Sequence, residues 1–193
     1  NYLFYQPKEL WQYDAALFNC SRNEVHAYML RRLKPNLPMS QMTFVTVDEV
    51  ANAHMKELAA VYPVLNEDKA KEADERFCKF VQSVFEKRKV SSVFLTGEGF
   101  ENNWYPNSLR VLCNGRRAFI GNNLYSKGAC YTAYRKKYTH IENPVYLDES
   151  KLTDRVTLNM RVNGQEEWYP VVSWGNHWYE ANNQWEVLTN EVD

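Results

Sequence analysis

The hydrophobic period of the sequence changes near residue 48, and this change constrains the fold more than any other feature. Before it, three segments rich in β-branched and aromatic residues indicate strands at 11–19, 24–31 and 42–47. After it, apolar side chains recur every three or four residues in 48–61 and 66–89, which predicts two helices. Three consecutive strands followed by helices indicate an α/β domain.

The rest of the first 140 residues alternates between strands and helices. The segments 92–96 and 117–120 indicate short strands, and 106–113 and 123–138 indicate helices. The meander gives antiparallel pairs and the crossover helices give parallel ones, so the predicted sheet is mixed. Five strands in this order, with helices on both faces, form a ribonuclease H-like arrangement. The fourth strand would lie beside the first.

The pattern changes again after Pro144 and becomes entirely β. The segment 155–162 alternates apolar and polar residues and is followed by Asn163-Gly164, a strong hairpin signal. We therefore predict two domains, an α/β domain at 1–142 and a β-rich domain at 143–193.

The β-rich segment contains four of the six tryptophans. Its remaining strands are expected at 166–174 and 177–188. Alternation would place Trp168, Val172 and Trp174 on one side, as in the core of a β-sandwich. The alternative is an exposed aromatic platform that binds a sugar or a protein partner.

Glycine is scarce in this chain but is concentrated in one stretch. The seven glycines of 193 residues are about half the usual share. Five of them lie between residues 97 and 128. The first two belong to the turn Gly97-Glu98-Gly99-Phe100, which follows the apolar strand 92–96. A glycine in such a turn allows a ligand or another backbone to approach closely.

This strand and turn, Val93 to Phe100, resemble the adenosine motif of the actin, sugar kinase and heat-shock chaperone superfamily. The whole chain is similar to an uncharacterised bacterial family of actin-like proteins. The resemblance implies an adenine nucleotide, ATP or ADP with Mg²⁺, whose base or ribose lies at Gly97, Glu98, Gly99 and Phe100. Asp14 would lie nearest the phosphates. It also implies a partner, the first lobe of a longer parent protein, which this chain does not include.

The first hairpin departs from the pattern of that superfamily. Its members carry glycines after an aspartate, and the glycine N–H groups hold the phosphates. Here Ala15 and Ala16 follow Asp14, and the turn 20–23 contains no glycine. A hairpin without glycine forms a phosphate cradle with difficulty. We expect a degenerate nucleotide site and no turnover by the isolated chain.

Two other functions fit the same fold. One is a protein-interaction scaffold that binds no nucleotide. The other is a metal-dependent nuclease, whose two metal ions would need Asp14, Asp48 or Glu49, and Glu98 to converge. Asp48 as a helix cap and Glu98 as a turn residue are the simpler interpretations.

Charge and residue usage exclude several classes of protein. With 23 basic and 24 acidic side chains the net charge is −1, which argues against nucleic-acid binding. The run Lys87-Arg88-Lys89 is expected to be a solvated helix end. No apolar segment is long enough for a membrane span. The four cysteines and four histidines lack metal-ligand spacing, so no metal site is predicted. Buried reduced thiols and the lack of a signal peptide indicate a cytoplasmic protein, and the start at Asn1 suggests an excised piece.

Overall fold

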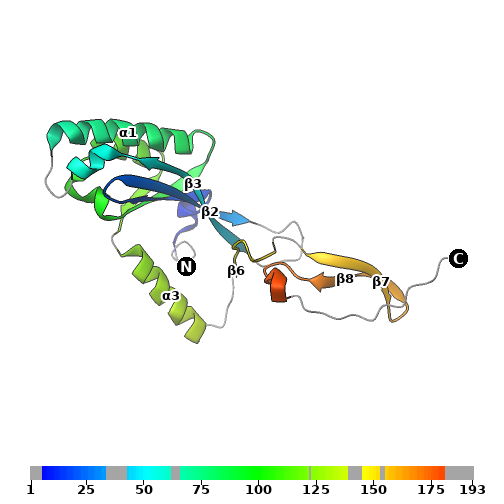
Figure 1. Ribbon diagram of the computed structural model, residues 1–193. Helices are drawn as coiled ribbons and strands as arrows, with labels where there is room; N and C mark the ends of the chain where they lie inside the picture. Colours follow the sequence, from blue (N-terminus) through cyan, green and yellow to red (C-terminus); the bar gives the residue numbers. More distant parts are fainter. Residues whose placement is uncertain are drawn as a thin grey trace.

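The computed structural model describes residues 6–33, 43–61, 66–121, 123–138, 145–152 and 155–180. Its main sheet has six strands in the order β5-β4-β1-β2-β3-β6 (Figure 1). The strands are β1 (Asp14–Cys20), β2 (Glu24–Leu33), β3 (Phe44–His54), β4 (Val90–Thr96), β5 (Arg117–Ile120) and β6 (Val145–Tyr146).

The pairing of the strands confirms the predicted mixed α/β sheet. β1, β2 and β3 form the antiparallel meander, while β4 pairs in parallel with both β1 and β5. This is the ribonuclease H-like strand order, with the fourth strand beside the first. The sheet has one strand more than predicted, because β6 pairs in parallel with β3. The domain boundary at 142/143 stays a prediction, although β6 lies beyond it and completes the main sheet.

Two helices cover one face of this sheet. α1 (Glu67–Phe85) begins at Asn66, whose side chain accepts a hydrogen bond from the Lys69 N–H at 3.1 Å. α2 (Pro106–Cys113) lies beside α1 (Figure 1). Together with β1, β2 and β4 they enclose the main core, which includes Phe18, Met29, Phe77, Val81, Leu95 and Leu112.

A buried carboxylate fixes α2 to α1. Asp74 is 1% exposed and accepts hydrogen bonds from the Asn107 N–H at 2.8 Å, the Ser108 N–H at 2.8 Å and the Ser108 hydroxyl at 2.6 Å. These amides belong to the first turn of α2, which has no other partner for them within the helix. A side chain of α1 therefore caps α2, a contact that the sequence pattern did not indicate.

The prediction of a helix at 48–61 is wrong. β3 continues to His54, and only a short 3₁₀ helix follows at Lys56–Ala60. The ten-residue β2 pairs with β3 along its whole length, with a bulge between Ala27 and Tyr28. Pairing with a long neighbouring strand therefore overrides the local helical period.

Within the residues that the structure describes, no helix packs along the opposite face of the sheet, so the prediction of helices on both faces holds there for one face only. α3 (Leu124–Tyr138) has no buried residue and extends away from the sheet (Figure 1). Its apolar side chains, predicted to form a stripe, are distributed around the helix. Only its first turn, through Leu124, packs against the sheet.

The strands β7 (Val156–Val162) and β8 (Gln165–Val172) form a separate hairpin. Its turn is the predicted Asn163-Gly164, with φ of 52° and 85°. No residue of either strand is buried, and Trp168 is 65% exposed, so the sandwich core is wrong for the described residues. The predicted strand 177–188 begins instead with a 3₁₀ helix at Trp178–Glu180, and the rest lies outside the described residues.

All four cysteines are free thiols, but only Cys20 is fully buried. Its burial raises the pKa of the thiol to about 12. Cys113 and Cys130 are exposed, which corrects the expectation that all four are buried. Within the described part of the chain, no helix is long and apolar enough to cross a bilayer.

Candidate functional site

The glycine turn after β4 lies against the turn of the β1–β2 hairpin. Gly97 has a φ of +101°, and a Cβ at this position would lie 2.8 Å from the Asn19 side-chain oxygen and 2.9 Å from the Cys20 carbonyl carbon. Neither distance is possible for a real side chain. The close approach that requires glycine here is therefore an approach of the protein's own backbone.

The rest of the turn mostly faces the interior. A Cβ at Gly99 would meet the Cys20 Sγ and the Ser21 carbonyl oxygen. Phe100 is 5% exposed, and its ring lies 5.4 Å from that of Phe77 between centroids. Only Glu98 presents its side chain to solvent, where it pairs with Arg22 at 3.3 Å. Gly99 and Phe100 therefore serve the core, and ligand binding by these four residues stays a prediction.

Asp14 lies at the other end of the sheet. It opens β1 and is paired with Val90 at the start of β4, whereas Gly97 follows the end of β4. Because β1 has seven residues, the two positions are about 20 Å apart. The structure does not bring Asp14 together with the glycine turn, which corrects the expectation of one site that contains all five residues.

The carboxylates of the nuclease alternative do not converge either. Asp14 and Asp48 each lie 3.7 Å from the guanidinium of Arg31, so a cation lies where a metal would be needed. Glu98 lies at the opposite end of the strands, where it pairs with Arg22. Within the described ranges, no group of three or more potential metal ligands is found.

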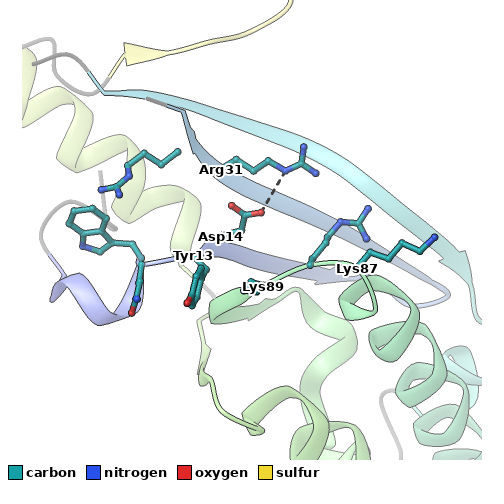
Figure 2. A pocket seen from close by; sticks show the side chains of 9 residues that line it. Tyr13, Asp14, Arg31, Lys87 and Lys89 are labelled. Carbon is teal, nitrogen blue, oxygen red and sulfur yellow. Dashed lines mark ion pairs between the residues drawn. The ribbon is translucent and has the colours of Figure 1, made fainter. Parts of the chain in front are cut away.

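Asp14 instead lies in a basic pocket of about 630 Å³ (Figure 2). β2 supplies two arginines at its end, and the turn between α1 and β4 supplies three further cations. The segment before β1 supplies two aromatic rings. The nine lining residues are Trp11, Gln12, Tyr13, Asp14, Arg31, Arg32, Lys87, Arg88 and Lys89.

Contacts within the basic pocket orient its side chains. Asp14 pairs with Arg31, as the dashed line in Figure 2 shows. Partial burial raises the pKa of Asp14, and Arg31 and Arg88 oppose this rise. Arg88 donates a hydrogen bond to the Val84 carbonyl oxygen at 2.7 Å. The sequence contains a signal for this pocket, since basic runs lie at 31–32 and 87–89, but a basic run at the end of a helix predicts a solvated helix end equally well.

An apolar groove of about 480 Å³ lies on the face that α3 leaves open. No charged side chain lines it, and Val47 on its floor is 41% exposed. Tyr28, which lines the groove, stacks with the ring of His26 and lies opposite Glu49 on β3, and the ring nitrogen of His26 lies 3.0 Å from a carboxylate oxygen of Glu49. The lining residues are Ala15, Ala16, Leu17, Tyr28, Leu30, Val47, Phe94, Leu124 and Tyr125.

Among solved structures, the chain is similar to Ppx/GppA proteins of Aquifex aeolicus. A crystal structure of the family member has 13% identity and a TM-score of 0.38, over 86% of this chain and 49% of that one. The type II variant of the Ppx/GppA phosphatase has 12% identity and a TM-score of 0.35, over 86% and 50%. The chain thus spans about half the length of these structures. At these TM-scores the likeness adds nothing to the fold that the strand order already shows.

Family models match almost the whole chain, whereas no curated protein matches it. A domain of unknown function (DUF8552) matches residues 151–193. The C-terminal model of a family of unknown function (DUF5716) matches residues 1–149. Because this second match covers most of the 193 residues, the chain belongs to the DUF5716 family and contains its C-terminal domain.

Proposed function

We propose that this chain is a docking lobe, whose open sheet face binds the region that precedes it in the full-length family protein. The observation that carries the proposal is the apolar groove. It is lined by nine residues without a charge and lies on a sheet face that no helix among the described residues covers along its length. Apolar surface of this kind on a soluble domain marks a place where another protein surface packs.

The form of the groove favours an amphipathic helix as its occupant. A ribonuclease H-like sheet buries both faces under helices, and α3 does not do so here because its apolar residues share no common side. The apolar lining, with the polar pair His26 and Glu49 next to the lining residue Tyr28, suits a protein interface with an apolar centre and polar surroundings. The family description places this domain at the C-terminal end, so the preceding region is the nearest source of such a helix.

Calorimetry tests this docking directly. The 193-residue chain is titrated with the separately produced preceding region of the same protein. We expect saturable binding with a Kd of about 10 μM or tighter, because an interface of ordinary size supports such affinity. Gel filtration of the chain alone is the control. Failure to bind the preceding region would contradict the proposal, as would self-association that leaves the groove filled by a second copy.

Adenine-nucleotide binding at the glycine turn is the second candidate. One observation favours it: the exposed side chains of Arg22 and Glu98 lie at the carboxyl ends of β1 and β4, where ligands of such sheets bind. The glycine-free hairpin does not fit a phosphate cradle, so we expect no ATP turnover by the isolated chain. Mg²⁺ would then be held by the phosphates, since the described residues offer no ligand cluster.

Titration with ADP distinguishes this second candidate from the first. A site at the glycine turn predicts that Arg22→Ala weakens ADP binding, while Lys136→Ala on the far end of α3 leaves it unchanged. Binding that both variants leave unchanged would place ADP elsewhere. No binding at about 1 mM ADP would remove nucleotide binding as a function of this domain.

A further inference from the structure

We propose that the basic pocket around Asp14 is a binding site for a small phosphate-bearing anion. This site is separate from the apolar groove and from the glycine turn, and it does not depend on the docking function.

The charge of the pocket is the first argument. Five cationic side chains and one carboxylate line it, in a chain whose overall net charge is −1. Like charges that share a cavity repel one another, and an anion removes that repulsion. Within the described part of the chain, Arg31 is the one cation of the five in an ion pair, shared between Asp14 and Asp48. The internal carboxylates therefore neutralise only a part of the positive charge.

The orientation of the cations is the second argument. Arg88 is fixed by its hydrogen bond to the Val84 carbonyl oxygen, and Arg32 lies 4.5 Å above the ring of Trp11. The Lys89 ammonium lies 5.7 Å from the ring centroid of Tyr13. Side chains held in this way lose less conformational entropy when a ligand binds. Figure 2 shows Arg31 of β2 and Lys87 and Lys89 of the turn after α1 around Asp14.

The size and walls of the pocket indicate the ligand class. A volume of about 630 Å³ suits a small molecule rather than a polymer. An excess of positive charge from three arginines and two lysines suits a phosphate group, because guanidinium and ammonium donors match its oxygens. Inorganic pyrophosphate and a nucleoside monophosphate share this chemistry, and the rings of Trp11 and Tyr13 offer a surface for the nucleoside.

The position of Asp14 predicts whether its removal strengthens or weakens phosphate binding. Its carboxylate repels an incoming phosphate and competes with it for Arg31. Asp14→Asn is therefore expected to tighten phosphate binding several-fold, whereas a carboxylate that holds the ligand or a metal would make the same change weaken it.

The experiment is calorimetric titration of the 193-residue chain with pyrophosphate and with AMP, at low salt. We expect saturable binding of at least one of them with a Kd below about 1 mM. The double variant Lys87→Gln/Lys89→Gln should weaken binding about tenfold, because it removes two charges next to the ligand. Lys136→Gln/Lys137→Gln removes the same charge from the exposed end of α3 and is expected to change nothing.

The comparison between the two ligands identifies the group that is recognised. Equal affinities indicate that phosphate alone is bound, and tighter AMP binding indicates that the aromatic walls contribute; either result supports the proposal. Absence of binding by both ligands overturns it. Equal weakening by the two double variants also overturns it, since binding would then reflect the overall charge. Circular dichroism confirms that each variant is folded.

Discussion

Gly97→Ala is expected to lower the free energy of unfolding by about 3 kcal/mol, among the largest effects of a single methyl group. Gly97 has a φ of +101°, and its added Cβ would collide with the Asn19 side chain and the Cys20 backbone. The hairpin backbone is held by the pairing of β1 with β2 and cannot move aside cheaply. Chemical denaturation followed by tryptophan fluorescence measures the change.

Gly115→Ala is the matched control for this prediction. Gly115 also has a positive φ, of +68°, but a Cβ there would meet nothing within 4 Å. Its substitution is expected to cost about 1 kcal/mol, the cost of the backbone conformation alone. If Gly97→Ala costs no more than Gly115→Ala, contact with the hairpin is not the reason for glycine at position 97. A ligand contact would then become the better explanation.

Leu30→Asp is expected to weaken docking of the preceding region at least about a hundredfold. Leu30 lies on the floor of the apolar groove, directly opposite Val47 on β3. A carboxylate there would have to lose its water under the docked helix without a partner, which costs several kcal/mol. The same calorimetric titration measures the loss.

Two further variants keep this prediction testable. Val156→Asp places the same charge on an exposed apolar position of β7, outside the groove, and should leave docking unchanged. Val47→Lys is the second groove variant, because Val47 is already partly exposed and tolerates a polar side chain better. Full binding by a folded Val47→Lys variant would contradict docking in the groove.

Most of the elements could be predicted from the sequence, because they depend on local patterns. The hydrophobic period predicts strands at 24–31 and 92–96 and a helix at 66–89, which the structure has at 24–33, 90–96 and 67–85. The hairpin turn Asn163-Gly164 follows from turn chemistry. The end of β3 could not be predicted in this way. Its last residues carry a helical period, and only their pairing with β2 makes them a strand.

The sequence indicates some residues of the candidate sites, but it does not show which residues lie beside them in space. The glycine turn was recognised, yet the sequence could not show that the β1–β2 hairpin occupies the space beside Gly97. The sequence indicates Asp14 as a site residue, but it does not show that Arg31 at the far end of the next strand and Arg88 after α1 lie beside it. The sequence does not predict the uncovered sheet face that carries the apolar groove. That face stays uncovered because the residues of α3 form a helix without an apolar side that could pack on it.

Hydroxyl-radical footprinting tests the docking of the groove most directly. It compares the isolated 193-residue chain with the full-length family protein that contains it. Tyr125 lines the groove and Tyr134 lies further along α3, and both are similarly exposed in this chain, at 64% and 58%. We predict that oxidation of Tyr125 falls several-fold in the full-length protein while that of Tyr134 stays the same. Equal oxidation of Tyr125 in both proteins would contradict the docking lobe.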